Sequence, residues 1–263
     1  MLLIADILGI LTYGMIAAML GTILPELSKK FGLSPKQNGN IGMAQAIGLM
    51  IGSFLAGPLM DLQGKKLGML VSLAVIALAL IGLRSATGYG SVAGLMLMLG
   101  TGGGALVTAA FAVAGDISVP WLQGAAVFNA VNLFFGLGGL ITPLVAARLF
   151  QNNANRLLIF AASIALIALA VNGMTEMAAA RGTVAFQADK ISILLGSPVL
   201  LLLSLALFLY VACEVGVWNW LARHLIAQGV PESKALTILS LGFALGLLLG
   251  RVAVVPVLCS VTP

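Results

Sequence analysis

The sequence predicts an all-α fold, a polytopic membrane helical bundle with about eight transmembrane helices. Of its 263 residues, 61% are hydrophobic and only 8% are charged, whereas a soluble domain needs about a quarter charged residues to cover its surface. The mean hydropathy is +1.14. The 32 glycines are spread through apolar runs, which favours closely packed helices over the alternating polarity of a membrane β-barrel. This composition excludes the disordered, fibrous and disulfide-rich secreted classes.

Charges, prolines and glycines divide the chain into eight apolar stretches, each close to the roughly 20 residues that cross a bilayer. In order, the expected helices span residues 3–24, 39–60, 67–83, 91–115, 122–149, 156–174, 198–225 and 235–258. The first stretch has no basic segment before it, so we expect a retained helix rather than a cleaved signal peptide.

The longest connection lies between the sixth and seventh stretches, and its charged residues are Glu176, Arg181, Asp189 and Lys190. It separates six helices from two. We therefore expect a six-helix N-terminal bundle over residues 1–174, a central cytoplasmic loop over residues 175–197 and a partial second bundle over residues 198–263.

The last two stretches resemble the first two at a nearly fixed offset, which indicates an internal repeat. The matched pairs are Tyr13 with Tyr210 at an offset of 197 residues, and Gly48 with Gly246 and Gly52 with Gly250 at an offset of 198. Chance likeness between apolar helices is the alternative. Because two complete repeats would occupy about twice this offset, we expect the chain to be truncated after its eighth helix.

The connection between the second and third stretches is a charged loop with the sequence GPLMDLQGKK, residues 57–66. Gly57 would remove a side chain where helices approach, and Gly64 would allow a tight turn. Asp61 would lie where a carboxylate can meet a helix N-terminus, and Lys65 and Lys66 would face lipid phosphates or cytoplasm. An ordinary short charged loop is the alternative.

This loop resembles the one between the second and third helices of the major facilitator superfamily, whose pattern G-x-L-x-D-x-x-G-[RK]-[RK] is met at every marked position. Further matching runs lie at residues 99–108, 129–143, 210–221 and 240–251. Together they resemble the branch that contains fucose and glucose permeases. The resemblance implies a multi-pass secondary transporter, in a bacterial inner membrane, that moves a small polar solute such as a sugar by alternating access. The coupling ion, H⁺ or Na⁺, stays open.

Two carboxylates that serve proton coupling in that branch are replaced here. The matching positions hold Gly21 and Thr22 in the first helix and Val107 in the fourth, and Phe111 stands where the branch has an asparagine. Because these side chains cannot carry a proton, the departures put that coupling route in question.

The candidate cavity residues are polar and aromatic side chains within apolar helices. Glu214 is near the middle of the seventh helix, where a charge is costly unless it faces the bundle interior. Tyr210 and Trp218 lie four residues to either side and therefore share its face, which suits hydroxyl groups and sugar rings. A purely structural glutamate is the alternative, and Asn129 and Asn132 are equally explained as interhelical hydrogen bonds. The predicted substrate-binding residues are Tyr13, Asn129, Asn132, Tyr210, Glu214 and Trp218.

Two ladders of small residues at four-residue spacing are expected to allow close helix contacts rather than to form a site. They are Gly100, Gly104 and Thr108, and Gly242, Gly246 and Gly250. Arg251 is expected near a membrane face, or paired with a carboxylate.

An enzyme is not expected, because the only histidine, His224, has no accompanying nucleophile motif. Cys213 and Cys259 lack the spacing of a zinc site. We therefore expect no cofactor and no metal. The cations are too dispersed for nucleic-acid binding, so that the expected partners are a solute and membrane lipid.

Orientation is predicted in two conflicting ways. Eight basic residues lie on the connections of one side, namely Lys29, Lys30, Lys36, Arg84, Arg148, Arg156, Arg223 and Lys234. The positive-inside rule would therefore place the amino terminus outside, whereas the resemblance places it inside, with Lys65 and Lys66 cytoplasmic. We favour the resemblance. The competing hypothesis for the whole chain is a truncated or frameshifted transporter fragment without independent activity, or a subunit that needs a partner.

Overall fold

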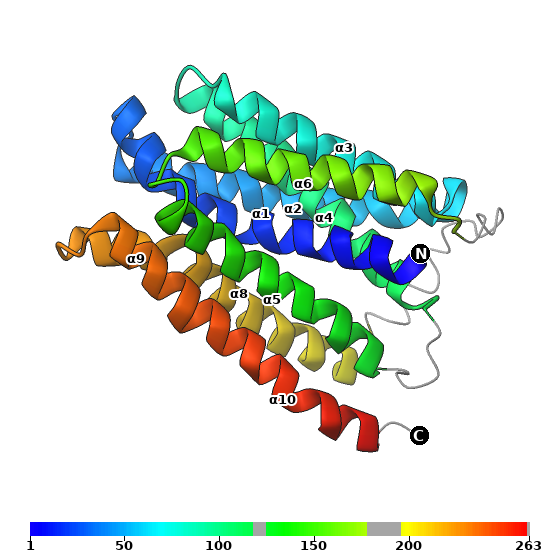
Figure 1. Ribbon diagram of the computed structural model, residues 1–263. Coiled ribbons are helices and arrows are strands. Elements are labelled where there is room, and N and C mark those ends of the chain that lie inside the picture. Colours follow the sequence, from blue (N-terminus) through cyan, green and yellow to red (C-terminus); the bar gives the residue numbers. More distant parts are fainter. Residues whose placement is uncertain (118–124, 178–195, 262–263) are drawn as a thin grey trace.

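A computed structural model describes residues 1–117, 125–177 and 196–261, and within these ranges every regular element is helical (Figure 1). The helices are α1 (Leu2–Phe31), α2 (Pro35–Gln63), α3 (Lys65–Arg84), α4 (Tyr89–Ala114), α5 (Ala125–Arg148), α6 (Ala154–Met174), α8 (Pro198–Ala227), α9 (Glu232–Ile238), the π-helical segment η1 (Leu239–Ala244) and α10 (Leu245–Val261). In this part of the chain, 8 helices are long and apolar enough to cross a membrane, the last being the continuous run Glu232–Val254. The predicted all-α membrane bundle is confirmed.

The helix ends follow local sequence. Helix α2 begins with a capping box, in which Ser34 and Gln37 each bond the other's backbone N–H, and α1 stops at Gly32, whose φ of 60° is left-handed. The main difference from prediction is that α1 does not end at residue 24. It continues to Phe31 through Pro25, because one proline removes a single backbone hydrogen bond and the charged last turns can project beyond the hydrocarbon.

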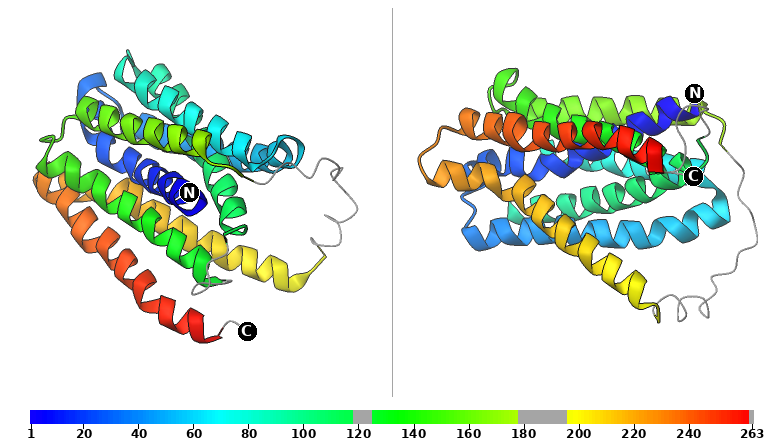
Figure 2. Two further views of the ribbon diagram at one scale, coloured as in Figure 1. Left: turned by 45° about the vertical axis from the view of Figure 1, so that its right-hand side comes forward. Right: turned by 90° about the horizontal axis from the view of Figure 1, so that it is seen from below.

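Helix α1 is at the centre of the packing and α8 is at its edge. α1 contacts α4, α5, α6 and α8, whereas α9, η1 and α10 pack on α5 (Figure 2). Within its most apolar window, 72% of α1 is buried but none of α8. Every residue of α8 from Pro198 to Cys213 is exposed. The first half of α8 therefore presents both of its faces to the surroundings.

The contact between α2 and α4 depends on glycines. Gly48 and Gly52 of α2, and Gly100 and Gly104 of α4, lie against the opposite backbone so closely that an added Cβ would overlap a carbonyl oxygen at each position. This confirms the close helix contact predicted for the Gly100 and Gly104 ladder. Small residues allow such backbone approach within a membrane, where dispersion contacts replace the hydrophobic effect.

The second glycine ladder behaves differently, and its prediction is wrong. A Cβ at Gly246 or Gly250 would meet nothing within 4 Å, and one at Gly242 would meet only Ile238 of the same helical run, at 3.9 Å. No other described helix packs on this face. Instead, the three glycines form one wall of a cavity. Gly57 also lies in open space, so the close approach predicted at that position is absent.

Candidate functional site

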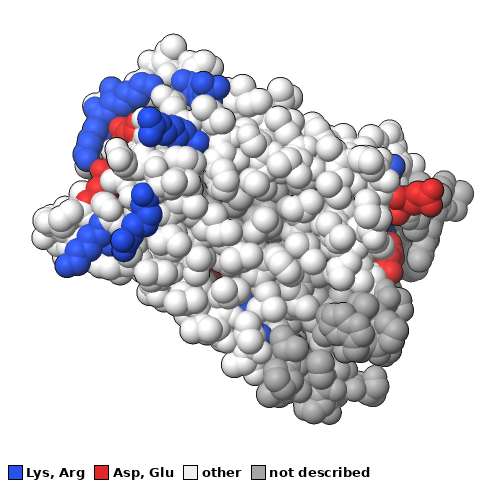
Figure 3. All heavy atoms as spheres, in the orientation of Figure 1, with Lys and Arg blue, Asp and Glu red and all other residues white. Residues whose placement is uncertain are grey.

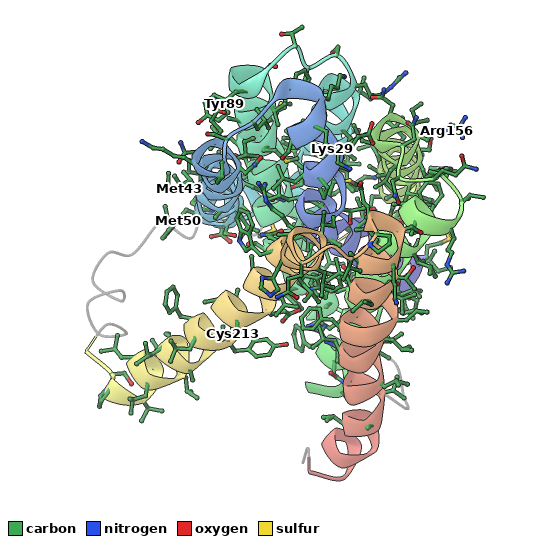
Figure 4. All side chains as sticks on the ribbon, turned by 90° about the vertical axis from the view of Figure 1, so that its left-hand side faces the viewer. Lys29, Met43, Met50, Tyr89, Arg156 and Cys213 are labelled. Carbon is green, nitrogen blue, oxygen red and sulfur yellow. The ribbon has the colours of Figure 1, made fainter. Side chains whose placement is uncertain are left out.

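A cavity of about 590 Å³ lies between α5, α8 and α10. With increasing distance from the α8–α9 turn, α8 and α10 diverge from one another (Figure 4). The cavity lies in the angle between them. The lining residues are Asn129, Tyr210, Gly242, Phe243, Gly246, Leu247, Gly250, Arg251 and Val254. A smaller cavity of about 170 Å³ shares Tyr210, Phe243 and Leu247 and adds Cys213, Glu214 and Val217.

An ion pair between α8 and α10 is the main polar feature of these cavities. Arg251 Nη2 lies 3.8 Å from Glu214 Oε1, and the two side chains are only 16% and 10% exposed. The indole N–H of Trp218 donates to the same carboxylate oxygen over 3.4 Å. Because the Arg–Glu contact is long and made by one nitrogen, it leaves guanidinium N–H groups for other partners.

Arg251 is anchored to α5 by three contacts. Its Nη1 donates to the carbonyl oxygen of Asn132 over 2.8 Å, and the Asn129 amide donates to the Arg251 carbonyl oxygen over 2.9 Å. The guanidinium carbon lies 5.1 Å from the ring centroid of Phe135, in cation–π range. Arg251 therefore links α5, α8 and α10, and it also lines the larger cavity.

The floor of the site is an aromatic contact. Trp218 is 1% exposed, and its ring meets Phe243 edge-on, with centroids 5.1 Å apart. Gly139 lies beneath, where an added Cβ would approach the indole to 2.5 Å. Phe243 belongs to the π-helical segment η1, and Ser240 of that segment donates to the Leu140 carbonyl oxygen over 2.7 Å. Such segments alter side-chain direction within a helix.

Contacts between α1, α8 and α9 hold these helices together at the end of the molecule that carries the α1–α2 and α8–α9 turns. Lys29 at the end of α1 pairs with Glu232 at the start of α9 over 2.8 Å. Gly21 lies so close to the Trp218 carbonyl oxygen that a side chain there would overlap it. These contacts join α1 to α8 and α9 at this end, whereas α8 and α10 separate toward the other.

The sequence from residue 7 to residue 258 matches the family model of the Major Facilitator Superfamily. This chain belongs to the Major Facilitator Superfamily. It is also similar to synaptic vesicle glycoprotein 2A of Rattus norvegicus and of Homo sapiens, each 26% identical over 139 residues that cover 53% of this chain and 19% of that protein.

A solved structure with a similar fold is a point mutant of the peptide transporter POT in complex with sulfate. It is 20% identical, has a TM-score of 0.58, and is matched over 83% of this chain and 46% of that one. The chain thus spans about a fifth of these curated relatives and about half of that structure. At this identity the likeness concerns the fold.

The structure places the predicted substrate-binding residues of this superfamily member around one site, with one exception. Tyr210 and Asn129 line the larger cavity and Glu214 the smaller one. Trp218 lies behind Glu214, and Asn132 contributes its backbone carbonyl rather than its side chain. The exception is Tyr13, which lies outside both linings and packs on Phe135 with centroids 5.4 Å apart.

Phe243 is a site residue that sequence reasoning missed, and for Arg251 it left both the partner and the place in the site unnamed. Of the two positions expected for Arg251, the structure shows pairing with a carboxylate. A charge-balance argument could have named Glu214 as that carboxylate, because a mid-helix glutamate and an arginine in the next apolar run are each costly alone and offset one another as a pair. Phe243 gave no signal, since a phenylalanine in an apolar helix is typical of lipid-facing and core positions alike.

The segment at residues 57–66, whose sequence pattern is typical of the superfamily, is expected from the sequence to be a loop, but α2 continues to Gln63 and α3 begins at Lys65, so Gly64 alone connects the two helices. Gly64 has a φ of 92°, as its turn requires, but no side chain caps the start of α3, so Asp61 does not act at that helix N-terminus. Asp61 is exposed and bonds to none of the described residues. Lys65 donates to Asp116 over 2.6 Å and to the Ala112 carbonyl oxygen over 2.7 Å, and thereby binds the C-terminal end of α4.

Proposed function

We propose that this chain acts as a secondary active transporter of a small polar solute, and that the solute binds at the Glu214–Arg251 pair. The observation that carries the proposal is this ion pair, whose Arg251 lines the larger cavity and whose Glu214 lines the smaller one, between helices that diverge at one end. Buried ionisable residues within a membrane mark substrate or ion paths more often than structural sites. Membership of a family of transporters supports the same function.

A sugar is the first solute that we propose. Tyr210 and Phe243 supply aromatic faces on which a sugar ring can stack, and Asn129 and Glu214 supply groups that bond hydroxyls. The buried Trp218 would contact solute only after the α8–η1 contact opens. Tyr13 and Asn132 would act through Phe135 and Arg251 rather than by touching the solute.

An anionic solute is the second candidate, and the observation that favours it is Arg251. Its guanidinium is held by one weak carboxylate contact and one carbonyl, so it has N–H groups for an oxyanion. The peptide transporter that shares the fold binds sulfate. A solute with a carboxylate or sulfate group would compete with Glu214 for this cation.

Alternating access would use the contacts between α1, α8 and α9. Opening the cavity toward the α1–α2 turn requires breaking the Lys29–Glu232 pair and separating Gly21 from Trp218. We propose that the α2–α3 junction, formed by Gly57, Asp61, Gly64, Lys65 and Lys66, acts as the conformational gate at the opposite end. The six-helix and two-helix division would then supply the two moving bodies, with H⁺ or Na⁺ as the coupling ion.

Uptake into liposomes tests the function. Purified chain should accumulate labelled fucose or glucose, and Glu214→Gln should reduce that uptake at least tenfold because the amide cannot pair with Arg251. If the second candidate holds, the chain should accumulate labelled sulfate instead, and Arg251→Gln should abolish that uptake because it removes the cation that binds the anion. Lys234→Gln, on the exposed surface, is the matched control and should leave uptake unchanged. Absence of uptake of any of these solutes by the unmodified chain would contradict the proposal, and so would sugar uptake that Glu214→Gln leaves intact or sulfate uptake that Arg251→Gln leaves intact.

For orientation, we propose a cytoplasmic amino terminus in a bacterial inner membrane, with residues 175–197 as a cytoplasmic loop, of which residues 178–195 lie outside the described part. Cysteines introduced at the exposed positions Gln63 and Lys36, at opposite ends of α2, would report it after Cys213 and Cys259 are replaced by serine. In whole cells, an impermeant thiol reagent should label the cysteine at position 36 and spare that at 63. The reverse labelling would invert the topology.

A further inference from the structure

The eight basic residues of one side gather at one end of the folded molecule, where the α1–α2, α3–α4, α5–α6 and α8–α9 turns meet, and we call this surface the basic end (Figure 3). Only Arg223 among them is half-buried, and the other seven are exposed. They come from four separate turns, so that folding, not one sequence cluster, concentrates the charge.

Acidic residues at the basic end do not neutralise it. Glu232 pairs with Lys29, and the Glu26 carboxylate accepts the backbone N–H of Ala154 at the start of α6. No carboxylate in the described ranges lies in ion-pair distance of Lys30, Arg148 or Arg156. Most of the positive charge therefore faces outward without a protein partner.

The opposite end has a different balance. There Lys65 is bound to Asp116, and Asp61 and Glu176 are exposed, so that within the described residues carboxylates offset Lys65 and Lys66. Within the described residues, the basic end therefore carries more unpaired positive charge than the opposite end.

The basic end lies directly above an apolar band. Arg148 ends α5 and Arg156 is in the first turn of α6, and Ile159, about one turn further into α6, is 45% exposed. The surface between the two ends shows almost no charge in Figure 3. In a bilayer this arrangement places the guanidinium groups at the level of lipid phosphates and Ile159 at the level of the upper acyl chains.

We propose that the basic end is a binding surface for anionic phospholipids, with Arg148 and Arg156 as phosphate-binding groups of one lipid site. Arginine binds phosphate oxygens through its planar array of N–H donors. A phospholipid can contact both the charged and the apolar part of this surface. Its phosphate binds the cations, and its acyl chains cover the apolar band beneath. A soluble phosphate would use the charge alone.

Native mass spectrometry of the full chain in mild detergent tests this proposal. We expect phosphatidylglycerol to remain bound at least fivefold more than phosphatidylcholine, and the double variant Arg148→Gln, Arg156→Gln to lower that ratio at least fivefold. The double variant Lys65→Gln, Lys66→Gln, at the opposite end, is the matched control and should keep the preference. Excess inorganic phosphate should not displace the lipid.

Three results would overturn the proposal. They are equal retention of the two lipids, an unchanged preference in the Arg148 and Arg156 variant, and an equal loss in the control variant. Displacement by inorganic phosphate would instead show a site for free phosphate. Because Arg148 and Arg156 are exposed, their replacement should leave the unfolding temperature unchanged, which separates lost lipid binding from lost fold. None of these readouts depends on transport.

Discussion

Replacing Arg251 with leucine is expected to lower the free energy of unfolding by about 3–5 kcal/mol. Glu214 would keep its buried position, at 10% exposure, but would lose its only cationic partner in the described structure. The Trp218 indole N–H, 3.4 Å from the carboxylate, cannot replace a charge. Denaturant unfolding of the purified chain in mild detergent, followed by tryptophan fluorescence, measures the change.

A double variant separates the lost pair from the lost side chain. Adding Glu214→Leu to Arg251→Leu removes the stranded carboxylate, so we expect stability to recover most of the way, because a buried pair contributes little net stability relative to apolar residues. Asp116→Asn is the matched control: its pair with Lys65 is about one-third exposed, and its loss should cost no more than about 1 kcal/mol. A single-variant cost below that of Asp116→Asn would mean that water reaches Glu214.

The helices could be predicted from composition, because a hydrocarbon solvent permits few alternatives for the backbone. The site could be predicted in part for a similar reason. Tyr210, Glu214 and Trp218 share one face of a helix through spacing alone. Arg251, however, is brought to Glu214 by the packing of α10 on α5, a contact between segments that are far apart in sequence.

The two glycine ladders show where sequence reasoning stops. Gly100 and Gly104 have the same spacing as Gly246 and Gly250, yet the first pair packs against a backbone and the second borders a cavity. Glycines at four-residue spacing allow another helix to approach closely. Whether a helix lies there depends on how the rest of the chain packs. Tyr13 lies outside the cavity linings for a related reason, since the packing of α1 on α5 places its ring against Phe135.

Replacing Gly100 with leucine is expected to prevent stable folding of the bundle. Leucine has a helix propensity up to about 1 kcal/mol more favourable than that of glycine, and it is also more hydrophobic. Helix propensity and hydropathy alone would therefore favour the substitution. The obstacle is the Gln45 carbonyl oxygen of α2, which even a Cβ would overlap. Because backbone cannot move aside by changing rotamer, overpacking should cost more than the 1–3 kcal/mol typical of cores. Size-exclusion chromatography in detergent should show the monomer replaced by aggregate.

Alanine variants at two positions of α4 give a second test, because the expected change in unfolding temperature has opposite signs at the two positions. At Gly94, where an added Cβ meets nothing within 4 Å, alanine should raise the unfolding temperature, since only the propensity gain applies. At Gly100 alanine should lower it, because the overlap with α2 outweighs that gain. Gly94→Leu, the matched control for the leucine variant, should remain monomeric. If Gly100→Ala and Gly94→Ala shifted stability in the same direction, α2 and α4 would not be in backbone contact at Gly100.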